Sequence, residues 1–364
     1  MSVAESGIQR RPGLRGLFVR GWVSRNAVPL LFFFLCAAGV LVSGTSIMFV
    51  LQEIVIRLAR NSFLVLSLIV PVVAGLGLNF GIVLGAMAGQ TGLFIVTHLK
   101  MPGMSGLLAA VAISLPLAVA LGFLAAYVLN RARGREMIAG MILGFFMNGI
   151  YQFVYLFLCG TLFPIDNPDL VLPQGFGLRV TVELKHIKYA LDNVLMIVLG
   201  SVPVPVVTLA VSAVAALGIR ALFRTKLGQD FRAVGQSEQK AQISGIDVDR
   251  TRTIAVVIST VLAAVGQIIF LQNVGTVNTY SSHEQVGTFA IAALLVGGAT
   301  VVKATVGQAI LGVILFRLLF IVSPHAGQRL MGHPQVGEYF RVFVAYAVIG
   351  VVLFLHALER ARRR

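Results

Sequence analysis

Long apolar runs separated by short polar segments make up most of the chain after residue 26. Most of these runs are close to the ~20 residues that an α-helix needs to cross the hydrocarbon core of a bilayer. The run Ser62–His98 is too long for one helix and contains Pro71 and several glycines, so we divide it near Asn79. The pattern predicts an all-α integral membrane protein with about ten transmembrane helices: Ala27–Leu51, the two halves of Ser62–His98, Ser105–Asn130, Met137–Gly160, Val194–Gly218, Ile254–Leu271, Val286–Val302, Ala304–Val322 and Val342–Leu358.

The polar segments between the runs differ in charge, and the difference predicts the side that each one occupies. Alternate segments, which we assign to the cytoplasm, hold 20 Lys and Arg, whereas the segments on the other side hold eight. Because positive residues favour the cytoplasmic side, both termini are expected there. The predicted domains are a basic amphipathic lead-in that contacts membrane lipid (1–26), a transmembrane domain (27–358) with a cytoplasmic loop (219–253) and an outer loop (161–193), and a basic cytoplasmic tail (359–364).

The composition favours a membrane protein over a soluble one. Hydrophobic residues make up 57% of the 364 residues and charged residues only 12%, about half of the ~25% found in ordinary soluble domains. The net charge of +15 invites a nucleic-acid partner, but the basic residues gather at the ends of apolar runs, so we expect none. Cys36 and Cys159 lie in apolar runs without metal-ligand spacing, so no metal site is expected.

The longest polar segment, Thr225–Arg252, lies between two apolar runs. Asp230–Gln242 is rich in helix-forming residues and predicts a short helix. Gly245 is a plausible C-terminal stop for this helix, because glycine tolerates the left-handed conformation. Asp247 and Asp249 then fall where the next helix begins, which suits the positive end of its dipole.

The spacing G-x3-R-A-V-G-x5-A-x3-G-I in this segment resembles the cytoplasmic coupling loop of ABC importer permeases. The most similar branch serves simple sugars, nucleosides and branched-chain amino acids. We call residues 219–253 the coupling loop. The residues that carry the resemblance, with the aspartate that follows them, are Gly228, Arg232, Ala233, Val234, Gly235, Ala241, Gly245, Ile246 and Asp247.

The resemblance implies several partners for this chain. In that family the coupling loop docks into a groove on ATP-hydrolysing subunits. Two permease chains, identical or different, pair around a central path, and an extracytoplasmic solute-binding protein delivers the substrate. Weaker resemblances at Glu136–Leu143 and Gly77–Gly85 favour the nucleoside type, and Ala290–Gly312 is similar to a glycine-rich region of the same family.

The chain has no phosphate-binding loop of the type G-x4-G-K-[ST] and no recognisable catalytic motif. We therefore expect a transport subunit rather than an enzyme, with no cofactor of its own and with ATP bound by a separate subunit. The predicted spans contain no Asp or Glu, which argues against a proton-coupled carrier. The histidines assigned to outer segments, His283 among them, are interpreted as interfacial polar residues.

A few polar residues inside the predicted spans are candidates for a substrate path. Amides buried in a bilayer must find partners or line water, so the alternative is that each one joins two helices. Phe80 and Tyr151 could stack on a sugar or a base. Arg317 is the one charged residue within a predicted span, and it either snorkels or pairs with a neighbour. The full candidate set is Asn79, Phe80, Gln90, Asn148, Tyr151, Gln152 and Gln267.

These features predict the permease subunit of an ABC importer for a small polar solute, a nucleoside or a simple sugar, in the cytoplasmic (inner) membrane. Two alternatives remain open. One is a branched-chain amino acid permease of the same family, and the other is a secondary carrier that works without ATP.

Overall fold

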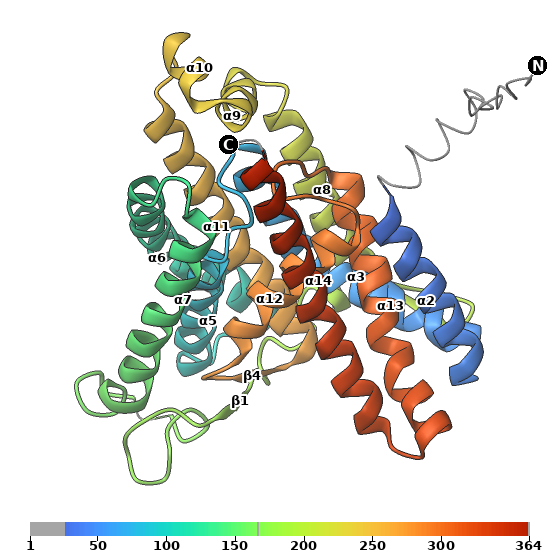
Figure 1. Cartoon of the computed structure of the whole chain (residues 1–364). Coiled ribbons are helices and arrows are strands. Elements are labelled where there is room, and N and C mark those ends of the chain that lie inside the picture. Colours follow the sequence, from blue (N-terminus) through green and yellow to red (C-terminus); the bar gives the residue numbers. More distant parts are fainter. Residues whose placement is uncertain (1–25, 166, 363–364) are drawn as a thin grey trace, which may run out of the picture.

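The structure is a computed structural model that describes residues 26–165 and 167–362 (Figure 1). The predicted lead-in therefore lies outside the described residues except for Asn26, as do the last two residues of the predicted tail. Helices dominate the described chain, in agreement with the predicted class. They are α2 (Ala27–Ser43), α3 (Ile47–Ser67), α4 (Ile69–Val73), α5 (Ile82–His98), α6 (Gly103–Arg131), α7 (Glu136–Phe153), the π-helix η1 (Val154–Leu158), the 3-10 helix η2 (Asp192–Val194), α8 (Val206–Leu222), α9 (Lys226–Gln236), α10 (Glu238–Ile243), α11 (Val248–Val274), α12 (Ser282–Val296), α13 (Val306–Met331) and α14 (Pro334–Arg362).

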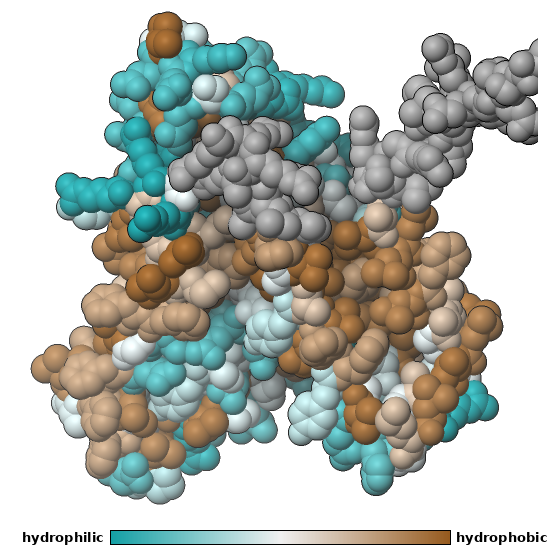
Figure 2. Space-filling view, viewed as in Figure 1, coloured by the Kyte–Doolittle hydropathy of each residue, from teal (hydrophilic) through white to brown (hydrophobic). Residues whose placement is uncertain are grey.

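Five helical segments in the described chain are long and apolar enough to cross a membrane: α3 with α4, α6, α7 with η1, α11 and α13. The bent pair of α8 and α9, which meet at 74°, makes a sixth if it is one broken span. Helices α2 and α5 are apolar but have only 17 residues each. Figure 2 shows a broad hydrophobic band between hydrophilic ends of the molecule. The chain is thus a multi-pass membrane protein, whereas the count of ten spans and the sides of the termini stay predictions.

The first predicted span, Ala27–Leu51, is wrong as a single helix. α2 ends at Ser43, and Gly44 follows with a left-handed φ of 59°, a conformation that glycine adopts without strain. Ser46 then caps α3 by accepting a backbone hydrogen bond from its first turn at 3.2 Å. A glycine and a capping serine, two positions apart, therefore stop one helix and start the next.

Helix α3 continues through residues 52–61. These residues lie between the first two predicted spans, and the charge pattern assigns them to the outer side of the membrane. Glu53, which lies outside the predicted spans, is therefore part of a helix long enough to cross a membrane. Arg57 Nε donates to Glu53 Oε2 at 2.9 Å, one helical turn away. Such pairing lets a helix carry charges within an otherwise apolar segment.

The predicted helix Val194–Gly218 is also wrong in its first half. Residues there form a β-hairpin of two antiparallel strands, β2 (Met196–Leu199) and β3 (Val202–Pro205). Pro203 and Pro205 have no N–H to donate inside a helix, so the helix starts only after them, as α8.

The segment Ser323–Arg341, predicted as an outer loop, is mostly helical instead. α13 runs on to Met331 and α14 starts at Pro334, a favourable first helical residue. The two helices turn back on each other at very short range. A Cβ added to Gly337 would lie 1.8 Å from the carbonyl oxygen of Ser323. The close approach buries both backbones, and the polar sequence gave no sign of it.

The interruption predicted near Asn79 is confirmed: residues 74–81 form an irregular turn between α4 and α5. α5 then runs through the interior between α6 and α11. Three of its glycines let neighbouring backbones approach closely, since a Cβ at Gly85, Gly89 or Gly92 would lie 2.3–2.5 Å from a carbonyl oxygen of α11 or α6. The turn at Asn79 is therefore tied to a rigid part of the core.

A short antiparallel sheet joins two of the segments expected on the outer side, 161–193 and 272–285. Strand β1 (Thr181–Glu183) pairs with β4 (Thr276–Asn278), with Val182 opposite Val277. This sheet lies at the end of the molecule opposite α9 and α10 (Figure 1). Segments that the charge pattern assigns to one side thus lie together, and the coupling loop lies at the other end.

Candidate functional site

The coupling loop folds into two short helices that lead into α11. Thr225, Ser237 and Asp247 each cap a helix by accepting a backbone N–H, at 3.3, 3.3 and 3.0 Å. Gly245 ends this helical pair with a φ of 81°, and Asp247 starts α11, both as predicted. The predicted helix Asp230–Gln242 is wrong as one element, because extended backbone at Ser237 divides it into α9 and α10.

Two motif glycines lie where no other residue fits. A Cβ on Gly228 would lie 2.2 Å from the carbonyl oxygen of Leu222, so this glycine permits the sharp turn from α8 to α9. A Cβ on Gly235 would lie 2.1 Å from the carbonyl oxygen of Val73 at the end of α4. A Cβ on Gly75 would in turn lie 2.8 Å from the Cα of Gly235. α9 therefore lies directly against the turn that contains Asn79.

The other motif residues divide into an inner and an outer set. Val234 and Ala241 are buried, and Ala233 and Ile246 pack against them. Arg232 is exposed, with its guanidinium carbon 5.6 Å from the centre of the Phe223 ring. The buried residues pack with Val248 at the start of α11 and so hold the loop in place. Arg232 remains at the surface, where another molecule can contact it.

A basic groove of about 1040 Å³ runs beside α9. Its walls come from α8, α9 and the turn before α13, and four cations line it: Arg220, Arg224, Arg232 and Lys303. A cationic, partly open surface of this kind favours an acidic protein partner.

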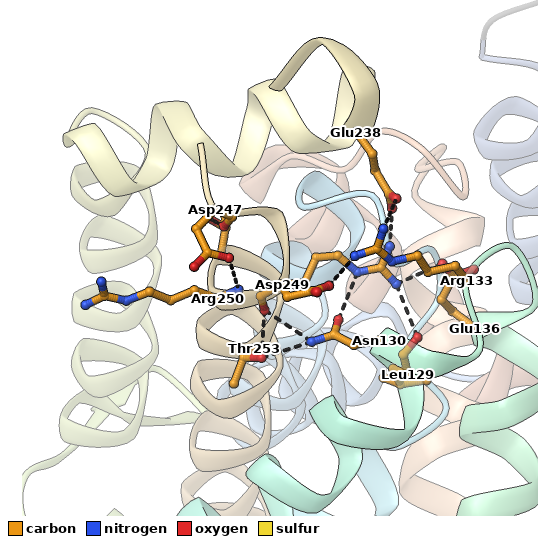
Figure 3. Close-up of polar contacts among 11 residues, drawn as sticks. Leu129, Asn130, Arg133, Glu136, Glu238, Asp247, Asp249, Arg250 and Thr253 are labelled. Carbon is orange, nitrogen blue, oxygen red and sulfur yellow. Dashed lines mark hydrogen bonds and ion pairs between the residues drawn. The ribbon is translucent and has the colours of Figure 1, made fainter. Parts of the chain in front are cut away.

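Arg252, at the start of α11, is fully buried and is held by residues from three other elements. Its guanidinium forms ion pairs with Glu136 Oε1 at 2.8 Å and with Glu238. Its Nε donates to Asn130 Oδ1 at 3.1 Å, and another nitrogen donates to the carbonyl oxygen of Leu129 at 3.3 Å. Glu136, Glu238 and Asn130 converge on one point in Figure 3. We call Asn130, Arg133, Glu136, Glu238, Asp249 and Arg252 the arginine clamp.

The arginine clamp ties the start of α10 to the α6–α7 turn and to α11. Arg133, in that turn, forms ion pairs with Asp249 and, at 3.9 Å, with Glu238. The hydrogen bond to Asp249 raises the pKa of Arg133 above its ordinary value. A buried guanidinium stays charged at low cost only when it is paired in this way. The coupling loop is therefore fixed at its far end as well as at α9.

A mostly apolar pocket of about 470 Å³ with a few polar groups lies between α5, α7, α12 and α14. We call it the central pocket. Its volume is in the range of small-molecule sites. The residues that line it include two of the predicted path residues, Phe80 and Asn148, together with Phe145, Glu284 and Tyr346. Phe145 and Tyr346 are 70% and 59% exposed, so the pocket opens on the flank of the molecule.

A hydrogen-bond network lies behind this pocket, centred on His283. The ring nitrogens of His283 lie 2.9 Å from Gln90 Oε1 and 2.8 Å from Asn148 Oδ1. Tyr151 donates to Gln90 Oε1 at 3.0 Å, and Gln152 donates to Asn148 Oδ1 at 3.4 Å. Two of the predicted path residues, Gln90 and Asn148, therefore bond His283 directly. The Tyr151 ring lies 4.6 Å from the His283 ring, centre to centre, and Gln152 is joined to it through Asn148.

His283 is fully buried, so its interpretation as an interfacial residue is wrong. Asn148 also donates to Glu284, which carries the only carboxylate lining the central pocket within the described residues. The sequence could have marked both, because His283 and Glu284 directly precede an apolar run.

The remaining two path candidates lie elsewhere. Asn79 is buried in the turn before α5, where its oxygen accepts from Gly81 N at 3.0 Å and its amide lies 3.5 Å from the Ser259 hydroxyl of α11. Gln267 is buried on α11, and neither end of its amide has a partner among the described residues. These two lie outside the lining of the central pocket. Within the described chain, no group of His, Cys, Asp and Glu is arranged to hold a metal ion.

Several known proteins match part of this chain. The xylose transport system permease protein XylH of Haemophilus influenzae is 32% identical over 46% of this chain and 45% of its own length. The nucleoside ABC transporter permease protein NupC of Lactococcus lactis is 30% identical over 39% and 43%. The autoinducer 2 import system permease protein LsrC of an Enterobacter species is 37% identical over 27% and 28%. The chain thus spans less than half the length of these curated relatives, and no solved structure matches it.

A family model covers far more of the chain than any of these relatives. Residues 75–355 match the model described as the permease component of the branched-chain amino acid transport system. The matched range contains the turn at Asn79, the coupling loop, the arginine clamp and the central pocket. With its long apolar helices, the chain is a multi-pass protein of the inner membrane. It belongs to this family of ABC transporter permeases, as the spacing in its coupling loop indicates.

Proposed function

We propose that this chain is the permease subunit of an ATP-driven importer, and that it forms part of the path for a nucleoside or a simple sugar. The observation that carries the proposal is the contact between α9 and the turn at Asn79. The same turn contains Phe80, which lines the central pocket. A displacement of α9 is thus passed to the pocket wall through about eight residues of backbone.

The chemistry of the central pocket supports a neutral, hydroxyl-rich solute. Aromatic rings and amide or hydroxyl groups line the pocket, and rings of this kind stack on sugars and bases while amides bind hydroxyls. The relatives named for xylose and nucleoside transport agree with this solute class.

A branched-chain amino acid is the second candidate. Glu284 supports it, because a carboxylate at the pocket wall could pair with a substrate ammonium group. The family description points the same way.

The same geometry supports a proposed place for each partner. ATPase subunits, which would bind the ATP, dock on α9, α10 and the basic groove. A second permease chain, identical or different, covers the flank where Phe145 and Tyr346 are exposed, and so closes the central pocket. An extracytoplasmic binding protein delivers the solute at the end where β1 and β4 lie.

The experiment that tests this function is a purification of the tagged chain in mild detergent, with co-purifying subunits identified by mass. An ATPase subunit and a second permease chain are expected. The binding protein would then be screened with xylose, adenosine and leucine by thermal melting. A chain that purifies alone, and that transports solute in vesicles without ATP, would favour a secondary carrier and refute the proposal.

A further inference from the structure

A second cavity, next to the central pocket, is lined by arginines. It has about 290 Å³ and lies between α3, α12, α13 and α14. Arg57, Arg317 and Arg341 line it, and Gln285 and Phe289 of α12 line both cavities. We call it the arginine cavity. Its volume is at the lower end of the range for small-molecule sites.

Arg317 is the least compensated charge at this cavity. It makes no hydrogen bond or ion pair with any residue that the structure describes, and its only recorded contacts are with rings. Its guanidinium carbon lies 5.9 Å from the ring centre of Phe316 and 5.7 Å from that of Phe320. The charges that act on it come from Arg57, Arg60 and Arg341, and all of them are positive.

The neighbouring arginines are only partly compensated. Arg57 pairs with Glu53 at 2.9 Å, and Arg341 lies 3.4 Å from Glu338. Arg60 donates to a single amide oxygen, that of Asn273, at 3.1 Å. Asn273 in turn donates to Asp192 at 2.7 Å, and the charge of Asp192 acts on Arg60. Four arginines therefore face three carboxylates, Glu53, Glu338 and Asp192, which leaves one positive charge in excess.

Buried donors in the same cluster also lack acceptors. The Nε atoms of Arg60, Arg317 and Arg341 are buried and have no partner within the described part of the chain. Buried polar groups are nearly always hydrogen-bonded, and an unpaired charge in a membrane protein is costly. Three orphaned N–H groups beside a cavity of ligand size indicate that an acceptor with negative charge belongs there.

We propose that the arginine cavity binds a phosphate group. Guanidinium groups bind phosphate and carboxylate with paired, charge-assisted hydrogen bonds. A carboxylate offers two oxygens, whereas a phosphate group offers up to three terminal oxygens for the three donors, and its negative charge offsets the excess positive charge. The phosphate belongs either to a small solute or to a lipid headgroup. Phosphate binding at this site requires neither ATP nor the proposed import function, so a failure of either proposal leaves the other untouched.

Binding is tested on the full chain, purified and reconstituted in nanodiscs. One arm titrates inorganic phosphate against chloride at equal ionic strength in phosphatidylcholine discs and follows the unfolding midpoint. The other arm compares phosphatidylglycerol with phosphatidylcholine and counts retained lipid by native mass spectrometry. Arg317→Gln should weaken binding by about tenfold or more, the effect expected for one charge-assisted hydrogen bond. Arg131→Gln, at an exposed site remote from the cavity, is the matched control.

Both positive outcomes support the site and name its ligand. A midpoint that rises with phosphate, and less so in the Arg317 variant, assigns the cavity to a free phosphorylated solute. Selective retention of phosphatidylglycerol that Arg317→Gln abolishes assigns it to a lipid. If the Arg317→Gln protein does not accumulate in the membrane, Arg341→Gln replaces it as the test variant and should weaken the same binding. The proposal is overturned if the wild-type chain shows neither a phosphate-dependent shift nor a preference for the anionic lipid.

Discussion

Replacing Gly235 with alanine should uncouple ATP hydrolysis from transport while leaving the fold intact. The new Cβ would lie 2.1 Å from the carbonyl oxygen of Val73, whereas an ordinary contact begins at 3.4 Å. α9 must therefore move by about 1.3 Å, the difference between these distances, or the turn at Gly75 must give way. Overpacking of this kind costs about 1–3 kcal/mol. If all of it weakens the coupled state, uptake falls roughly 5- to 150-fold.

The assay is solute uptake per ATP hydrolysed in vesicles that contain the chain with its ATPase and binding-protein partners. Gly218→Ala is the matched control, because it makes the same change inside helix α8 with nothing within 4 Å of the added Cβ. Its uptake should equal that of the wild type. If Gly235→Ala, present in the membrane at normal amounts, also transports solute with the wild-type ratio, the contact between α9 and α4 does not transmit the motion.

Three further changes test the other parts of the site. Arg232→Glu reverses an exposed charge at the basic groove and should abolish retention of the ATPase in a pull-down while the protein stays inserted; undiminished retention places the docking surface elsewhere. Arg252→Gln leaves two carboxylates without their buried partner and should lower the free energy of unfolding, measured by chemical denaturation, by about 3 kcal/mol. The control Arg250→Gln, at an exposed site, should leave that free energy unchanged. Asn148→Leu removes a pocket amide and a partner of the buried histidine, so the KM for uptake should rise; an unchanged KM makes Asn148 a packing residue.

The sequence predicted those features that depend on neighbouring residues. The turn at Asn79, the stop at Gly245 and the start of α11 at Asp247 all follow from local rules about glycine and helix caps. The spacing of the motif glycines also pointed to the coupling loop, although not to the reason, which is the contact of Gly235 with α4.

Features that depend on distant residues could not be predicted in this way. Arg252 lies 116 residues from Glu136, and no periodic pattern connects them. His283 has a polar neighbourhood in the sequence, and only the packing of α5 and α7 against α12 buries it. The hairpin at Pro203 was missed because an apolar run does not by itself distinguish a helix from strands.

The two attachments of the coupling loop have different consequences for transport. At Gly235 the contact is between backbones, so it transmits displacement without adding much stability. At Arg252 the contact is a set of buried ion pairs, so it adds stability but lies away from the turn that leads to Phe80. If this division is right, Gly235→Ala should lower uptake per ATP even in the protein that remains folded, whatever its overpacking does to the unfolding midpoint. Arg252→Gln should lower the midpoint and leave the ratio unchanged in the protein that remains folded. If both variants lose uptake per ATP and unfolding midpoint to the same extent, the coupling loop moves as one rigid unit with α11. In that case α9 does not transmit motion on its own.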